Sequence, residues 1–311
     1  MSERASLFQS SRSPAHRVWE GFQYVVLASS ALAVVAPILA VAWILFQKGA
    51  PAISVDFITK APMRFMKAGG IMPALVGTLY LLAGTFIFAL PLGVFGAVYI
   101  TEYGRHSRFT RILRLAIVNL AGVPSVVYGL FGLGFFVLFI GGGIDRLFFA
   151  KDLPQPTYGT GALIWAALTL ALLILPVVIT ASEEALLSVP DSFRQASLAL
   201  GCTRWQTVRN VVLPSALPGI LTGMILGLSR AAGETAPILL TGASFFLPSL
   251  PEKANSPFMA LPYHLYIIST QVPDMPDKIP WGTALVLLIL VLGMNGIASF
   301  FRARARAGRK W

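Results

Sequence analysis

The sequence predicts an all-α integral membrane protein with six transmembrane helices. Three observations carry this prediction: 56% of the 311 residues are hydrophobic and 12% charged, the mean hydropathy is +0.74, and six long apolar runs follow one another. A water-soluble domain carries about twice that share of charged residues. A single cysteine cannot form a disulfide framework. Water-soluble and intrinsically disordered chains are therefore excluded as classes.

Each apolar run is long enough to cross a bilayer, which requires roughly 20 mainly apolar residues in a helix. None alternates as a barrel strand does, so helices must satisfy the backbone hydrogen bonds inside lipid. The predicted spans are residues 25–46, 71–100, 115–144, 158–180, a fifth from 211 past 240, and 281–301. Only the fifth contains charged residues.

The spans divide the chain into one membrane domain with two tails. The first run is longer than the core of a typical signal peptide, so we expect an uncleaved helix, with a cleaved signal as the alternative. The expected parts are a cytoplasmic N-terminal tail at residues 1–24, the first helix at 25–46, a core of five helices at 71–301 with a polar loop at 182–210, and a basic cytoplasmic tail at 302–311.

The positive charge predicts the orientation. The net charge is +11, but lysine and arginine lie between and beyond the apolar runs rather than on one soluble face, which argues against nucleic-acid binding. With the N-terminus in the cytoplasm, the inner side receives fifteen of these residues and the outer side eight. The positive-inside rule therefore predicts that both termini are cytoplasmic.

The polar loop between the fourth and fifth spans has its own helical pattern. Pro190 should end one helix, and Asp191 or Ser192 can cap a second that runs to about Leu200 and stops at Gly201. Such a helix could dock into a cleft on a soluble partner. The alternative is a solvated hairpin lying on the membrane surface, and the periodicity alone favours this alternative.

Within this second helix, the apolar positions are Phe193, Leu198 and Leu200, whereas Arg194 and Gln195 stay polar. The chain then reads Gln-Ala-Ser from Gln195, Gly201 six residues later, and Val-Val-Leu-Pro at 211–214. This pattern resembles the cytoplasmic loop signature of ABC importer permeases, from which the residues at positions 195 and 197 depart.

That resemblance implies a coupling helix that seats in a separate ATPase, so the chain itself would not be an enzyme. The absence of a Gly-Lys dipeptide, and hence of a Walker A phosphate loop, agrees with this expectation. The expected ATPase-coupling residues are Asp191, Phe193, Arg194, Gln195, Ala196, Leu200 and Gly201.

Two further strings narrow the resemblance. Gly-Val-Pro-Ser-Val-Val-Tyr-Gly at 122–129 and Arg-Ala-Ala-Gly-Glu-Thr-Ala-Pro at 230–237 are similar to phosphate importer permeases, most closely of the PstA-like type. The likeness covers about residues 70–301. It implies a type I ABC importer (MetI-like) permease fold in the bacterial inner membrane. The implied partners are a paralogous permease of the PstC-like type, two ATP-binding subunits and an external phosphate-binding protein, with inorganic phosphate as substrate.

Other functions stay open as alternatives. The nearest is an ABC importer permease for another oxyanion, such as sulfate or molybdate. A secondary carrier coupled to an ion gradient would transport without any ATPase. A membrane scaffold or sensor protein would not transport at all.

Arg230 and Glu234 are the charged residues inside the predicted fifth span. Burying such groups in lipid is costly, so they should face the protein interior or a water-filled path. Four residues apart on one helix face, they can pair. A guanidinium also suits a phosphate oxyanion, because its planar fork donates two hydrogen bonds. The alternative is an ion pair that only fixes helix packing.

Three polar residues complete the expected substrate pathway: Thr235, Ser125 and Tyr128. The Ser125 and Tyr128 hydroxyls could instead satisfy backbone groups freed by Pro124.

Gly219, Gly223 and Gly227 recur every fourth residue and favour close helix packing, either within the chain or against a second permease. The three histidines, His16, His106 and His264, lie far apart, so we expect no metal site and no cofactor.

Overall fold

The computed structural model describes residues 14–105, 107–149 and 156–308. Six helical segments in this part of the chain are long and apolar enough to cross a membrane. They are Trp19–Ala52, Met72–Tyr103, Ser125–Phe149, Leu163–Leu187, Arg204–Ala231 and Lys278–Arg304. The predicted all-α architecture with six spans is confirmed. The outermost parts of both expected tails, residues 1–13 and 309–311, lie outside the described residues, as does His106.

The N-terminal third consists of two long helices and a small connecting unit. Its elements are α1 (Pro14–Gly49), the 3-10 turn η2 (Ala50–Ala52), α2 (Val55–Thr59), β1 (Pro62–Met63), β2 (Ala68–Gly69), α3 (Met72–Val98) and the π-helical η3 (Tyr99–Tyr103). The first helix thus includes residues 14–24, which were expected to form a tail. The two strands pair antiparallel, Pro62 opposite Gly69, and make a hairpin at the proline- and glycine-containing connection.

The middle of the chain holds the third and fourth spans. Its elements are α4 (Arg108–Ala121), α5 (Ser125–Phe131), η4 (Gly132–Gly141), α6 (Gly142–Ile144), η5 (Asp145–Phe149) and α7 (Leu163–Leu187). The expected third span, residues 115–144, is wrong at its start, because α4 is a separate helix. Pro124 causes the break, since proline lacks an N–H and disfavours helical geometry in the residue before it.

The C-terminal part contains the polar loop and the last two spans. Its elements are α8 (Asp191–Ala199), α9 (Arg204–Thr207), η6 (Val208–Val212), α10 (Leu213–Ala231), α11 (Ala236–Thr241), α12 (Leu261–Thr270) and α13 (Lys278–Gly308). The fifth span does not continue past residue 240 as one helix: α10 ends at Ala231 and α11 begins at Ala236. Pro237 near the start of α11 cannot continue a helix from α10.

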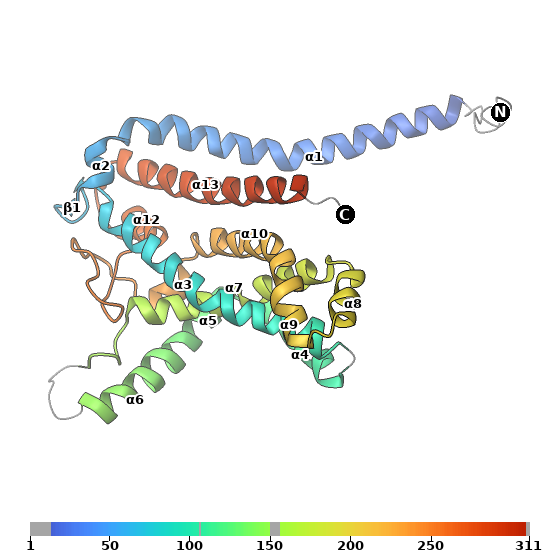
Figure 1. Cartoon of the computed structure of the whole chain (residues 1–311). Coiled ribbons are helices and arrows are strands. Elements are labelled where there is room, and N and C mark those ends of the chain that lie inside the picture. The colour runs from blue at the N-terminus through green and yellow to red at the C-terminus, as the bar shows by residue number, and fades with distance from the viewer. Residues whose placement is uncertain (1–13, 106, 150–155, 309–311) are drawn as a thin grey trace.

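The core is built around α7, which packs on α3, α10, α5 and α11. Small and branched apolar side chains, among them Ala167, Leu170 and Ile174, are fully or almost fully buried there. α1 and α13 lie side by side along one edge of the bundle (Figure 1). Figure 1 also shows α4, α8 and α9 at one end, with α2, α12 and the hairpin at the opposite end. The two ends therefore carry different structural units.

Candidate functional site

Arg230 and Glu234 form an ion pair at a break in the membrane helix. Arg230 lies in the last turn of α10, and Glu234 follows in the segment before α11. The prediction that both residues lie on one face of a continuous helix is wrong, because α10 ends between them. The turn that follows α10 still brings the two side chains together, with 3.7 Å between Arg230 Nε and Glu234 Oε1. The Arg230 side chain is 56% exposed in the isolated chain and that of Glu234 is 19% exposed. The guanidinium is thus accessible to a ligand.

The break containing this pair packs directly against α5. A Cβ atom built on Gly129 would lie 3.0 Å from both the Ala236 carbonyl oxygen and the Pro237 Cα. A side chain at this position would be tightly packed against that backbone, so glycine favours the close approach of the two helices. The two sequence strings at 122–129 and 230–237 therefore meet in space.

The expected pathway residues on α5 differ in what they contact. Tyr128 is buried, and its hydroxyl donates a 2.8 Å hydrogen bond to the Leu120 carbonyl oxygen, on the other side of Pro124. This is the backbone-satisfying role given above as the alternative. Ser125 begins α5, and Thr235 precedes α11 without capping it through its side chain. The Tyr128 hydroxyl is thus already engaged by a backbone carbonyl.

The three glycines of α10 face α7 within the same chain. A Cβ at Gly219 would lie 2.8 Å from the Ala185 Cβ, and one at Gly223 would collide with the Ala181 Cβ. At Gly227 the nearest side-chain atoms, from Ile174 and Val178, would be 3.6 Å away. Of the two packing partners left open by the sequence, these contacts favour the one inside the chain.

A second candidate site is α8, whose ends differ slightly from expectation. The helix begins at Asp191, so Pro190 is its N-cap residue, and neither Asp191 nor Ser192 acts as one. Pro190 has extended backbone torsion angles, with ψ of 139°, and its fixed ring geometry places the boundary there. Asp191 in the first turn still interacts favourably with the helix dipole.

The C-terminal end of α8 is closed by a Schellman motif. Gly201 has a φ of +85°, in the left-handed region that favours glycine. Its N–H donates to the Leu198 carbonyl at 3.0 Å, and the Cys202 N–H donates to the Ser197 carbonyl at 3.2 Å. Gly201 is therefore required by the backbone turn that ends the helix.

One side of α8 packs on the protein and the other is exposed. Ser197 is buried, and its hydroxyl hydrogen-bonds to that of Thr207 at 2.9 Å, which gives a role to this departure from the loop signature. Gln195, Ala196 and Leu200 are exposed, with Leu200 85% exposed. The exposed side contains several of the expected coupling residues.

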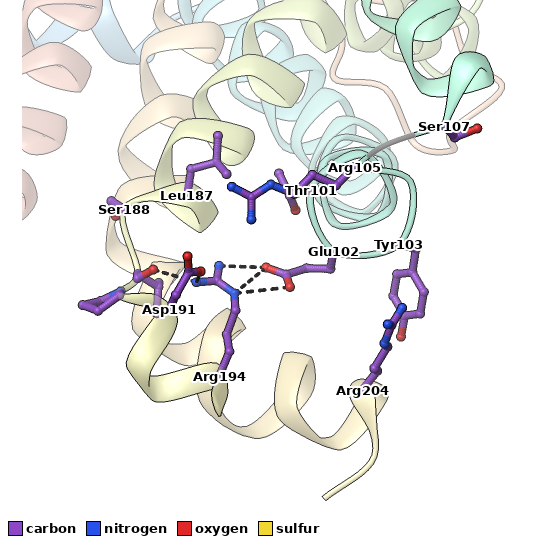
Figure 2. Close-up of a pocket in the computed structure, with 12 residues that line it drawn as sticks. Thr101, Glu102, Tyr103, Arg105, Ser107, Leu187, Ser188, Asp191, Arg194 and Arg204 are labelled. Atoms are coloured by element: carbon purple, nitrogen blue, oxygen red, sulfur yellow. Dashed lines mark hydrogen bonds and ion pairs between the residues drawn. The ribbon is translucent and has the colours of Figure 1, made fainter. Parts of the chain in front are cut away.

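Arg194 differs from the other expected coupling residues because it turns toward the body of the protein. Its Nη2 atom lies 2.8 Å from Oε1 of Glu102, which belongs to η3 at the end of the second span (Figure 2). Glu102 was not among the residues expected from the sequence. A lone carboxylate followed by Arg105, Arg108, Arg111 and Arg114 was the feature that could have indicated it.

These features define a class of protein: a multi-span membrane protein with a short helix exposed between its fourth and fifth spans. The profile described as "Binding-protein-dependent transport system inner membrane component" matches residues 89–307. The chain belongs to this family and is a multi-pass inner membrane protein. The ATPase of such ABC transporters is a separate protein chain, so the prediction that this chain is a transport subunit is confirmed.

Named relatives cover most of the chain. It is 32% identical to the phosphate transport system permease protein PstA of Haemophilus influenzae over 281 residues, which covers 89% of this chain and 92% of the relative. It is 37% identical to PstA 1 of Mycobacterium tuberculosis over 244 residues, covering 78% of this chain and 73% of the relative. The predicted resemblance to PstA-like permeases is confirmed.

The fold is similar to that of a solved ABC importer. A chain in the crystal structure of a bacterial alginate ABC transporter, in complex with an alginate pentasaccharide-bound periplasmic protein, matches with a TM-score of 0.62. The match covers 93% of this chain and 95% of that one, at 16% sequence identity. It confirms the importer permease fold.

Proposed function

We propose that this chain is the transmembrane permease subunit of an ATP-driven importer of inorganic phosphate, forming half of the translocation pathway. The observation that carries the proposal is the exposed Arg230 guanidinium beside the break between α10 and α11. The PstA proteins described above are named as phosphate transport permeases, which supports phosphate over sulfate or molybdate.

The geometry of the ion pair suits a transient anion site. At 3.7 Å, Arg230 Nε and Glu234 Oε1 are too far apart for a short charge-assisted hydrogen bond. The guanidinium can therefore turn to donate two hydrogen bonds to a phosphate oxyanion. Glu234 offsets the cation when no anion is present, which keeps Arg230 from holding phosphate too tightly for transport. Thr235 and Ser125 are the further hydroxyl donors that we assign to this pathway.

The same proposal assigns α8 to energy coupling. Its exposed side would seat in one of two ATP-binding subunits, with both termini of the chain in the cytoplasm. A paralogous permease would form the other half of the pathway, and an external phosphate-binding protein would deliver the anion. ATP binding would move α8, and phosphate released from the binding protein would then pass Arg230.

The test is Arg230→Gln, which keeps a hydrogen-bond donor but removes the charge and the fork. We expect uptake of radiolabelled phosphate, in cells without other phosphate carriers, to fall roughly tenfold or more per assembled permease, since a charge-assisted partner is lost. Near-normal uptake per assembled complex would show that Arg230 only packs.

A paired variant separates transport from packing. If the ion pair is structural, Arg230→Gln should reduce permease abundance in step with uptake, and adding Glu234→Gln should restore both. If the proposal holds, abundance stays close to the wild-type level and the double variant remains inactive. Excess unlabelled sulfate should leave phosphate uptake by the wild-type transporter unchanged, whereas full competition would favour a general oxyanion permease.

A further inference from the structure

Arg194 joins three parts of the protein through one side chain. Its Nε and Nη2 atoms lie 3.1 and 2.8 Å from Oε1 of Glu102. Nη2 also donates to the Leu186 carbonyl at 2.8 Å, and Nη1 donates to the Val189 carbonyl at 2.6 Å. A further contact of 3.2 Å links Nη1 to Asp191. All three guanidinium nitrogens are thus used to connect α8 with the end of α7 and with η3.

This contact is more shielded from water than the other ion pairs among the described residues. The side chains of Arg194 and Glu102 are 15% and 14% exposed, whereas those of Arg114 and Glu183 are 45% and 19% exposed. Shielding strengthens an ion pair when its hydrogen bonds are complete, and most exposed pairs contribute little. The shielded Arg194–Glu102 ion pair, or bridge, therefore holds α8 and η3 in a fixed relative position.

The bridge crosses a cavity of about 490 Å³ between η3 and α8 (Figure 2). Along its backbone α8 packs mainly on α9 and η6, which form the start of the fifth span. Arg105 and Arg204 also line the cavity, and neither forms an ion pair with any residue the structure describes. Figure 2 shows the dashed contacts of Glu102 running to Arg194. The Arg194 side chain thus links α8 directly to the second span.

We infer that Arg194 and Glu102 are positioning residues that transmit the movement of α8 to the second and fourth spans together. The inference rests on the proposed function of α8 as the ATPase-coupling helix. α3, which η3 extends, packs against α7 over much of its length. A displacement of α8 pulls on both through one guanidinium, so the two spans move as a unit. Without the bridge, α8 can move while the second span stays in place.

The hydrogen bonds of Arg194 predict that a positive charge at this position is not sufficient to connect α8 with η3 and α7. Lysine carries a positive charge on a single nitrogen and cannot hold Glu102 and two carbonyl oxygens in the fixed directions of a guanidinium. Arg194→Lys should therefore behave like Arg194→Gln. Glu102→Gln keeps the size of the side chain but removes the charge, so it should weaken the same connection.

The experiment uses the complete transporter, with its binding protein, reconstituted in lipid vesicles. Phosphate transported and ATP hydrolysed are measured together for the wild type, Glu102→Gln, Arg194→Lys and the control Arg114→Gln. The control removes an ion pair between α4 and α7 that does not involve α8. We expect the two bridge variants to transport roughly tenfold less phosphate per ATP, with hydrolysis continuing, and the control to retain the wild-type ratio.

Several results would overturn the inference. A wild-type ratio of phosphate transported to ATP hydrolysed in either bridge variant would show that the bridge transmits no movement. An equal fall of this ratio in Arg114→Gln would show that the loss of any ion pair reduces coupling. A separate measurement tests whether α8 contacts the ATPase at all. If this part of the proposed function is wrong, Gln195→Cys in the otherwise wild-type complex will form no cross-link with the ATPase.

A covalent replacement covers the case in which the bridge variants assemble poorly. In a Cys202→Ser background, Glu102→Cys and Arg194→Cys are introduced together and joined after assembly by a short thiol-reactive linker. We expect the linked transporter to recover most of the wild-type ratio relative to the unlinked sample. No recovery on linking would count against a mechanical role.

Discussion

His264 is a single buried side chain with a measurable consequence for stability. It lies in α12, is 2% exposed, and its Nδ1 atom has no hydrogen-bond partner among the described residues. Burial disfavours the charged form and lowers its pKa from 6.5 to about 4. The unfolded chain therefore binds a proton at this residue below pH 6.5, whereas the folded chain does not until about pH 4.

This difference predicts that acid destabilises the protein through His264. Between pH 6.5 and about 4, the free energy of unfolding should fall by up to about 1.4 kcal/mol per pH unit as pH is lowered, and above pH 6.5 the effect vanishes. His264→Phe removes the titrating group, so its Tm in detergent should decline less between about pH 7.5 and 5 than that of the wild type. Equal declines would contradict the assignment.

At the scale of single residues, the sequence predicted which side chains are functional candidates better than it predicted which side chains they contact. The closeness of Arg230 and Glu234 in the sequence predicted their pairing, although a turn after α10, and not the expected helix face, brings the two side chains together. Arg194 and Glu102 are 92 residues apart, and only the folded arrangement of η3 and α8 brings them together. The sequence showed that Arg194 is polar, but could not show that it faces inward.

At the scale of elements, the close packing of α10 on α7 depends on the glycines of α10, which have no side chain. Gly223→Ala would place a methyl group against the Ala181 Cβ, whereas Gly227→Ala would make an ordinary contact at 3.6 Å. Overpacking of this kind costs about 1–3 kcal/mol. We therefore expect Gly223→Ala, but not Gly227→Ala, to lower the Tm of the purified permease.

A compensating change tests the geometry of that contact. Adding Ala181→Gly to Gly223→Ala removes the opposing methyl group and should restore most of the lost stability. If the double variant is no more stable than Gly223→Ala, the two helices do not approach each other in this way.

Helix number and helix boundaries were not equally predictable. Hydropathy located six spans, because each must match the thickness of the bilayer. It merged α4 with α5 and α10 with α11, since the residues at both breaks are themselves mostly apolar or small. The prolines at 124 and 237 mark the two helix breaks in the sequence. Proline also occurs inside continuous helices of this chain, however, as at Pro91 and Pro176. Which prolines break a helix depends on the packing around them.

At the scale of the whole molecule, the orientation in the membrane remains a prediction from charge. With Cys202→Ser as the background, cysteines at Ser2 and Ala307 should resist membrane-impermeant thiol reagents in intact cells, because both tails are expected inside. A cysteine at Lys253, in the connection before α12, is the matched control and should react from outside. Labelling at Ala307 together with protection at Lys253 would reverse the proposed topology.

The pairing of α1 with α13 sets an order of events during synthesis. α1 packs mainly on α13, and the Lys48 ammonium near its end lies 4.6 Å from the centre of the Trp281 ring, far later in the chain. A ribosome adds about 5–20 residues per second, so the first helix waits in the bilayer for many seconds before its neighbour is made. During that interval α1 must be stable in lipid alone, which the uncharged run at residues 25–46 permits. The contact between α1 and α13 can therefore form only after the sixth span has been made.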